Sequence, residues 1–168
     1  MLEKIANWFL IGACAVFIVA MGGYARRQFL VAPSRPSAPP QPDFRVGQPA
    51  RIIGAGARQQ TLVLGISPSC SFCRGDIPIY QRLALTKKVT EGSVQVVAIF
   101  PPESLDGARA FMKQNHIPGA VRVARDAKDF PFNGTPTVLL LDKNDMVVWV
   151  WKGSLSQEAQ KDLLGRLS

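Results

Sequence analysis

The chain has 168 residues, 47% of them hydrophobic, and it carries a formal net charge of +8. The positive charge is spread among acidic residues, and no arginine-rich run or basic motif interleaved with aromatic residues is present, so we expect no nucleic-acid partner. When an apolar N-terminal segment and a proline-rich stretch are set aside, about 125 residues remain, which is the size of one domain. A domain of this size is large enough to fold without disulfide staples.

The first element along the chain is an apolar stretch that runs from Ile5 to Gly23 without a charged residue. Its length of about nineteen residues is just enough to cross a bilayer. Trp8 and Tyr24 lie near its ends, where aromatic belts form. We therefore predict an N-terminal membrane anchor at 1–25, a retained transmembrane helix. A cleaved signal peptide is the alternative, because the small residues in Gly23-Tyr24-Ala25 fit a cleavage site.

Residues 26–43 form the second segment, which is rich in proline. Proline fixes φ and removes a backbone donor, so this stretch does not form a helix or a sheet. We predict an extended linker, with a reach of roughly 30 Å at about 3.1 Å per residue.

Residues 44–168 form the third segment, in which apolar runs alternate with helical patterns. Strands are predicted at 61–66, 93–100, 121–123, 137–141 and 146–151, and helices at 71–90, at 104–116 and after Gly153. The loop 142–145 makes the last two strands an antiparallel hairpin. Ser154 and Gln157 have the spacing of a capping box for the last helix. This order predicts an α/β fold, with a central sheet that carries helices on both faces.

Two cysteines, Cys70 and Cys73, lie where the first predicted strand of this segment runs into a helix. Free backbone N–H groups and the positive end of the helix dipole favour a thiolate on Cys70. Such a thiolate attacks disulfides, and Cys73 one turn later is placed to resolve the mixed disulfide, so we predict a catalytic redox pair. A permanent disulfide and a metal site stay open as alternatives. A zinc site needs about two further ligands, whereas the chain adds only Cys14, in the apolar segment, and His116.

These features resemble the thioredoxin fold, and in particular the membrane-anchored thiol-disulfide oxidoreductases of the TlpA/ResA type. Besides the cysteine pair, the resemblance rests on Pro78, where that group has a proline that kinks the helix, and on Gly134-Thr135-Pro136-Thr137 before the hairpin. The resemblance implies a thioredoxin-like fold, a central mixed sheet flanked by helices. It also implies a cis peptide bond before Pro136 and a substrate groove at Thr135 and Pro136.

The same resemblance implies a membrane-tethered enzyme that exchanges its dithiol or disulfide with exported protein substrates. Reduction, for example in cytochrome c maturation, would be the commonest direction, with a membrane thiol electron donor or acceptor as partner. The implied place is the inner (cytoplasmic) membrane, with a single span and the domain in the periplasm. Arg26, Arg27 and Arg35 after the span favour the opposite orientation. No cofactor or metal is expected, and a monomer is the expected state.

The expected catalytic residues are Cys70 and Cys73, and the expected substrate-binding residues are Thr135, Pro136, Phe72 and Ser69. Ser69 and the dipeptide Ser71-Phe72 depart from the residues usual in thioredoxins, so the direction of electron flow is not carried over from the resemblance.

A second departure is Leu64, which occupies the position of the buried acid that many thioredoxins carry. Asp76 is a possible substitute for that acid, and the alternative is a plain acid in the first turn of a helix. We also expect Phe130, Phe132 and Asn133 to form a rim beside the active-site loop.

For three further side chains, Trp149, Trp151 and His116, we predict a structural role and no part in catalysis or metal binding. Trp149 and Trp151 alternate along one strand and are expected to pack on the sheet. His116 is expected at the end of a helix, where a cation complements the dipole.

A copper-binding metallochaperone of the Sco kind is the alternative function, because soft thiolates suit Cu(I). That family has Cys-x-x-x-Cys with a downstream histidine, whereas the loop between Cys70 and Cys73 is one residue shorter. The peroxiredoxin pattern Pro-x-x-x-Thr-x-x-Cys is absent from the sequence.

Overall fold

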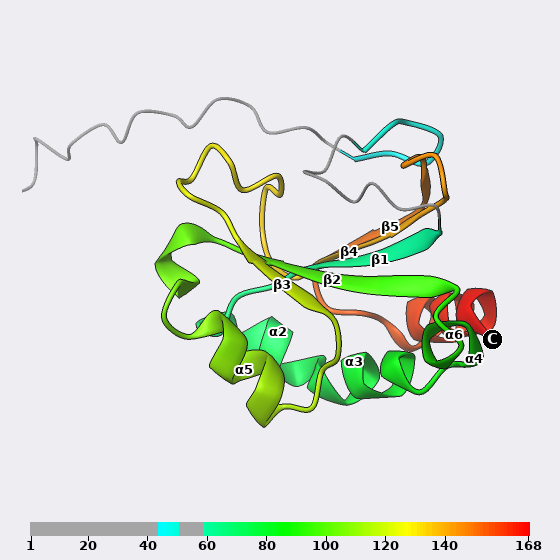
Figure 1. Ribbon diagram of the computed structural model, residues 1–168, viewed down its shortest axis with the longest axis horizontal. Coiled ribbons are helices and arrows are strands. Elements are labelled where there is room, and N and C mark those ends of the chain that lie inside the picture. The colour runs from blue at the N-terminus through cyan, green and yellow to red at the C-terminus, as the bar shows by residue number, and fades with distance from the viewer. Residues whose placement is uncertain (1–43, 51–58) are drawn as a thin grey trace, which may run out of the picture. The chain divides into compact units, whose positions relative to one another are not determined.

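The computed structural model describes residues 44–50 and 59–168, so the predicted anchor (1–25) and linker (26–43) lie outside the described residues. Within the described residues, no helix is long and apolar enough to cross a membrane. The described part of the chain forms one mixed sheet with its helices and loops (Figure 1).

The sheet has five strands in the order β3-β2-β1-β4-β5. The strands are β1 (Gln60–Gly65), β2 (Val94–Phe100), β3 (Ala120–Val123), β4 (Thr137–Leu141) and β5 (Val147–Lys152). β1 pairs in parallel with β2, and β2 with β3, whereas β4 is antiparallel to both β1 and β5. The five predicted strands and the antiparallel hairpin are therefore confirmed.

The helices are shorter and more broken than the sequence predicts. They are α2 (Ser71–Gly75), α3 (Ile77–Ala84), α4 (Lys87–Thr90), the 3-10 turn η1 (Pro102–Ser104), α5 (Ala108–Gln114) and α6 (Gln157–Leu167).

The prediction of one helix over 71–90 is wrong. Pro78 lies in the first turn of α3, where its missing N–H costs nothing, and the chain breaks at Asp76 just before it. A second break follows at Leu85, and α4 then begins after Thr86.

The N-terminus of α6 also differs from the prediction. Ser156, not Ser154, is the capping residue, and its Oγ accepts a hydrogen bond from the backbone N of Ala159 at 3.2 Å. Ser154 instead donates its hydroxyl hydrogen to Asp76 at 2.6 Å. The buried carboxylate of Asp76 therefore binds Ser154, the residue that the sequence spacing predicted as the helix cap.

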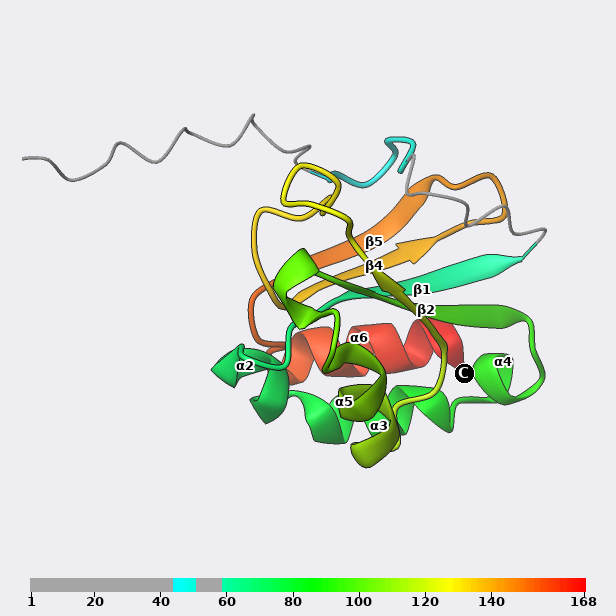
Figure 2. The ribbon, with the colours of Figure 1, turned by 60° about the vertical axis from the view of Figure 1, so that its left-hand side comes forward.

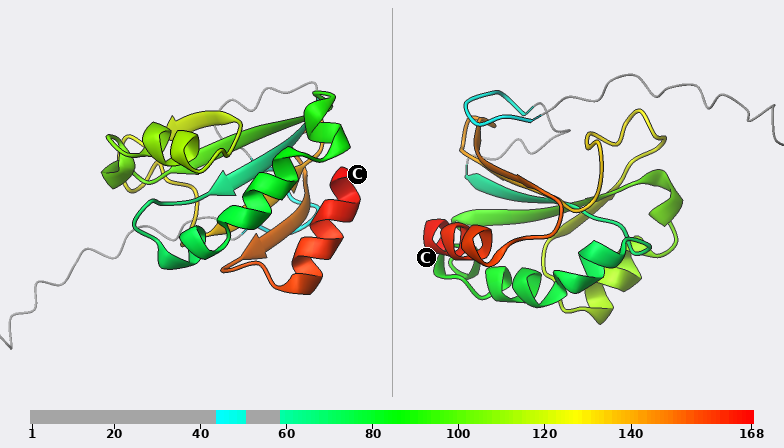
Figure 3. Two further views of the ribbon diagram at one scale, coloured as in Figure 1. Left: turned by 90° about the horizontal axis from the view of Figure 1, so that it is seen from below. Right: turned by 180° about the vertical axis from the view of Figure 1, so that it is seen from behind.

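Among the described residues, the helices cover one face of the sheet, in contrast to the prediction of helices on both faces (Figures 2 and 3). Alternate side chains of β1 show the two environments, because Leu62 and Leu64 pack in the helix-covered core while Val63 belongs to a second core. That second core contains Phe130 and Phe132 from the loop before β4. Aromatic side chains from this loop therefore cover the face of the sheet on which a helix was predicted.

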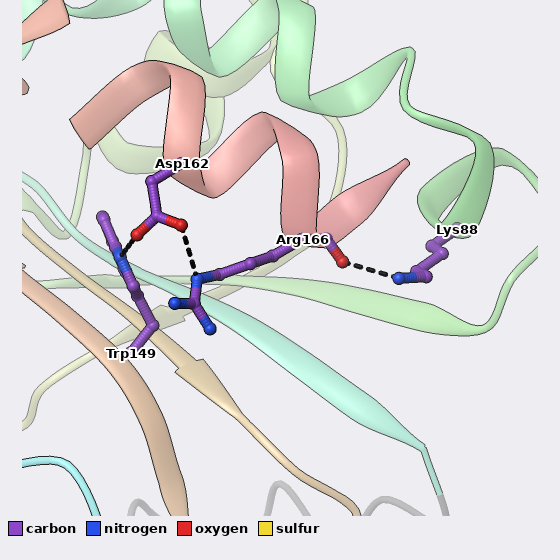
Figure 4. A network of polar contacts seen from close by, with 4 residues as sticks. All are labelled: Lys88, Trp149, Asp162 and Arg166. Carbon is purple, nitrogen blue, oxygen red and sulfur yellow. Dashed lines mark hydrogen bonds and ion pairs between the residues drawn. The ribbon is translucent and has the colours of Figure 1, made fainter. Parts of the chain in front are cut away.

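A polar network holds α4 and α6 in place (Figure 4). The indole N–H of Trp149 on β5 donates to Asp162 at 2.8 Å, and Arg166 Nε donates to the other oxygen of that carboxylate at 3.0 Å. Lys88 Nζ on α4 donates to the carbonyl oxygen of Arg166 at 2.6 Å. The rings of Trp149 and Trp151 stack, with centroids 6.4 Å apart, so both tryptophans pack on the sheet as predicted.

Candidate functional site

The cysteine pair lies at the carboxyl end of β1, where the chain turns into α2. Cys70 is the capping residue of α2, and its Sγ accepts a hydrogen bond from the backbone N of Cys73 at 3.2 Å. The turn before it is closed by the hydrogen bond from Cys70 N to Ser67 O at 3.2 Å. Cys70 is half-buried, whereas Cys73 is 0% exposed. One thiol is thus open to a reaction partner, and the second thiol is held behind it.

The two thiols differ in acidity. Burial on its own raises the pKa of Cys70, but hydrogen bonds from Cys73, Thr135 and the backbone N–H groups of the first turn outweigh it and lower that pKa below the ordinary 9.0. Burial, followed by the hydrogen bond to Cys70, raises the pKa of Cys73 to about 12. Cys70 is therefore the thiol that ionises more readily, and Cys73 keeps its proton at neutral pH.

The loop before β4 meets this pair. The Thr135–Pro136 peptide bond is cis, as predicted. Cys70 Sγ donates a hydrogen bond to the carbonyl oxygen of Thr135 at 3.3 Å, across 65 positions of sequence. The loop is held by a hydrogen bond from Gly153 N to Pro136 O at 2.8 Å and by one from Thr137 Oγ1 to Gly134 O at 2.8 Å. The fold thus brings the predicted residue Thr135 into contact with the Cys70 thiol, and Pro136 follows it in the same loop.

The two other predicted binding residues lie on the outside of the active-site loop. Ser69 is exposed, and its hydroxyl lies 2.9 Å from that of Ser67. The Phe72 side chain is 64% exposed, although it is a large apolar group. An exposed phenylalanine between the two cysteines is a surface that a partner can cover.

Asp76 is buried, with 5% of its surface exposed. It precedes α3 without capping it, and its carboxylate accepts hydrogen bonds from Ser154 Oγ at 2.6 Å and from Leu155 N at 3.1 Å. The interpretation as a plain helix-terminal acid is therefore incomplete, because this carboxylate joins the cysteine helices to the segment after β5. Leu64, at the position of the usual acid, is packed in the core.

Tyr80 is a residue of this region that the sequence analysis missed. It follows Asp76 by one helical turn and is buried, and its hydroxyl has no hydrogen-bond partner among the described residues. Burial and then the negative charges of Asp76 and the two cysteines raise its pKa. The signal was available, because Cys73, Asp76, Tyr80 and Leu83 are spaced three, four and three residues apart, which is one stripe of a helix.

The predicted rim residues Phe130, Phe132 and Asn133 lie in the loop before β4, just before the cis-proline. Phe132 is buried, with its ring centroid 5.2 Å from that of Phe130 and 5.7 Å from that of Phe44, while Asn133 is exposed. Phe132 and Asn133, but not Phe130, border a pocket of about 230 Å³ beside the cis-proline. The pocket is lined by Phe44, Phe132, Asn133, Gly134, Thr135, Pro136, Thr137, Lys152 and Gly153.

His116 is an exposed residue just after α5, at φ 51°, and it is not among the residues that line the pocket beside the cis-proline. In the part of the chain that the structure describes, no three side chains of the His, Cys, Asp and Glu types come together as metal ligands.

The sequence matches no protein-family model and no curated protein. Solved structures do match the fold. A Bacteroides thetaiotaomicron protein, whose structure was determined in solution, aligns with a TM-score of 0.62 and 16% identity over 73% of this chain and 87% of that one.

Two crystal structures align similarly. For a thiol:disulfide interchange protein of the thioredoxin family from Chlorobium tepidum, the TM-score is 0.53 at 21% identity, over 67% of this chain and 81% of that one. For StoA from Bacillus subtilis it is 0.51 at 18% identity, over 64% and 83%. At these identities the likeness concerns the fold, and it shows that the described part of the chain is thioredoxin-like.

Proposed function

We propose that this chain is a thiol-disulfide oxidoreductase, an enzyme that exchanges its Cys70–Cys73 dithiol or disulfide with protein substrates. The observation that carries the proposal is the asymmetric pair itself. An accessible thiol of lowered pKa lies at a helix start, and a buried thiol of raised pKa lies one turn behind it. This is the division between an attacking and a resolving cysteine.

The reductive direction runs in two exchange steps. The Cys70 thiolate attacks one sulfur of a substrate disulfide, which forms a Cys70–substrate disulfide and releases the other substrate sulfur as a thiolate that takes up a proton. Cys73 then loses its proton, and its sulfur attacks Cys70 Sγ. The Cys70–Cys73 disulfide forms, the second substrate thiol leaves, and two electrons have passed to the substrate. The oxidative direction reverses these steps.

The location, direction and substrates form the finer part of the proposal. The chain is tethered to the cytoplasmic membrane by residues 1–25 with its domain in the periplasm, and it reduces exported proteins such as apo-cytochromes c. A membrane thiol partner recharges it. This part is supported by the apolar stretch from Ile5 to Gly23 and by the resemblance to the TlpA/ResA type.

The first test is equilibration of the full chain with glutathione and dithiothreitol buffers. A reversible Cys70–Cys73 disulfide is expected, and a potential near about −270 mV marks a reductant while one near about −120 mV marks an oxidant. A pair that forms no reversible disulfide refutes the proposal.

The second test uses a trapping variant. Cys73→Ser should hold substrate proteins on Cys70 as mixed disulfides that dithiothreitol releases, because the resolving thiol is gone. The matched control Cys70→Ser should trap none, and equal trapping by both variants contradicts the assigned roles.

A further inference from the structure

Tyr80 is a buried residue of the redox region that takes no part in the exchange steps described above. Its side chain is 1% exposed and packs in the same core as Cys73 and Leu83. Its hydroxyl has no hydrogen-bond partner among the residues that the structure describes. A phenylalanine would fill the same space without leaving a buried hydroxyl unpaired, which destabilises the folded state. An unpaired polar group in a core therefore calls for an explanation from function.

Helix geometry directs this hydroxyl toward the redox pair. Hydrogen bonds from Asp76 N to Phe72 O and from Tyr80 N to Asp76 O, both 3.1 Å long, keep the helical turn through the break between α2 and α3. Cys73, Asp76 and Tyr80 therefore lie on one stripe. Because side chains of a helix lean toward its N-terminus, the Tyr80 ring extends over the turn that holds Asp76, in the direction of Cys73.

The Tyr80 hydroxyl lies among groups that carry or acquire negative charge. Burial, followed by the charges of Asp76 and the two cysteines, raises its pKa, so it keeps its proton and faces a negative charge as a donor. The Asp76 carboxylate lies near it without forming a hydrogen bond to it, and accepts instead from Ser154 Oγ and Leu155 N. The hydroxyl hydrogen is thus free to turn toward a further negative charge.

Resolution of a mixed disulfide would place such a charge in this cluster. Cys73 is completely buried, and burial is the largest cause that raises its pKa to about 12, so the thiolate that must form there is poorly stabilised. A donor that is already buried and unpaired stabilises this thiolate without first giving up another hydrogen bond or a shell of water. The Tyr80 hydroxyl therefore gains its partner only when Cys73 is charged.

We propose that Tyr80 assists the resolving step, because its hydroxyl turns its hydrogen toward the negative charge that forms on Cys73 and so speeds the attack of Cys73 on Cys70. In this step Cys73 gives its proton to the solvent, and its sulfur bonds to Cys70 Sγ. The bond between Cys70 and the substrate breaks, and the substrate sulfur leaves with the electron pair as a thiolate. Tyr80 keeps its own proton throughout. The inference rests on the proposed exchange function and adds a residue to it.

The test follows the two exchange steps separately in the reduced full chain, with Cys14→Ser so that the third cysteine does not react. The probe is the aromatic disulfide dithiobis(nitrobenzoate). It releases one coloured thiolate when Cys70 attacks it and a second one when Cys73 resolves the adduct. The rate of the first phase is proportional to the probe concentration, whereas the rate of the second phase is independent of it.

Tyr80→Phe should leave the first phase unchanged and slow the second phase about tenfold, because a donor to a buried charge is lost. A pH about one unit higher should restore the second-phase rate, since the fraction of Cys73 thiolate rises about tenfold per pH unit below its pKa. The matched control is Thr61→Val on β1. It also removes a buried hydroxyl without a partner among the described residues, and it should change neither phase.

Two results overturn the inference while exchange itself stands. The first is a second phase that is equally fast in Tyr80→Phe and in the unmodified protein. The second is an equal slowing of both phases by Tyr80→Phe, or an equal slowing of the second phase by Thr61→Val, because either would assign the effect to packing. A protein without a second phase that also forms no reversible Cys70–Cys73 disulfide in glutathione overturns the proposed function and the inference together.

Discussion

The acidity of the two thiols predicts how the reduced protein reacts with an alkylating agent at pH 7. A thiol with a pKa of about 12, as for Cys73, is ionised to about one part in 100,000, while a thiol below 9.0, as for Cys70, is ionised to at least about 1%. Cys70 therefore carries at least about a thousandfold more thiolate. The more basic Cys73 thiolate is the stronger nucleophile, and over three pKa units its higher intrinsic reactivity cancels about 15- to 30-fold of this excess. Cys70 should react at least about 30-fold faster, and the complete burial of Cys73 adds to this preference.

The assay is modification with less than one equivalent of iodoacetamide, followed by peptide mapping. Cys14→Ser provides a background in which the third cysteine does not compete. In urea, the same protein should lose the preference, because both thiols then have ordinary pKa values and full exposure. Similar labelling of Cys70 and Cys73 in the folded protein would refute the assignment of the attacking thiol.

Two further predictions concern the buried groups. Between pH 9 and about 12, the reduced protein should lose stability relative to the oxidised protein, by up to about 1.4 kcal/mol per pH unit, because unfolded Cys73 releases its proton there and folded Cys73 does not. Urea unfolding of both redox forms at pH 9 and 10.5 measures this, and an unchanged difference contradicts it. Tyr80→Phe should raise the free energy of unfolding by about 1 kcal/mol, since it removes an unpartnered buried hydroxyl. Thr61→Val, at another buried hydroxyl without a partner among the described residues, should raise it in the same way and leave exchange rates unchanged. Destabilisation by Tyr80→Phe would contradict this reasoning.

The strands and the redox pair were predictable because their signals are local. Short apolar runs bounded by turn residues identify the strands. The spacing of Cys70 and Cys73 at a strand end identifies the pair, and Gly134-Thr135-Pro136-Thr137 carries the cis-proline through its resemblance to a known motif. Each of these rests on neighbouring residues, so no knowledge of packing is needed.

Two of the errors concern partners that are distant in sequence, and one concerns a break within a helical pattern. Ser154 has the right spacing for a helix cap, but the carboxylate of Asp76, 78 positions away, binds its hydroxyl instead. One continuous helix was predicted over 71–90, with a kink at Pro78, because the apolar pattern continues across Asp76 into Ile79 and Leu83, whereas the chain breaks at Asp76. The helix-free face was missed because the side chains that cover it, such as Phe132, come from a loop whose packing on the sheet has no local sequence pattern.

Contacts between residues distant in sequence link three segments around the redox pair: the cysteine segment with α2, the cis-proline loop before β4, and the segment after β5. Ser154, after β5, bonds to Asp76, just after α2, and the neighbouring Gly153 bonds to the carbonyl of Pro136 in the cis-proline loop at 2.8 Å. The cysteine segment and the cis-proline loop are joined by the hydrogen bond that Cys70 donates to Thr135. Of these three hydrogen bonds, only the one from Cys70 depends on the state of the thiol, because neither a thiolate nor a disulfide sulfur has a hydrogen to donate. When Cys70 ionises or is oxidised, the carbonyl of Thr135 therefore loses this donor, and in the proposed exchange it is free to accept a hydrogen bond from a substrate N–H instead.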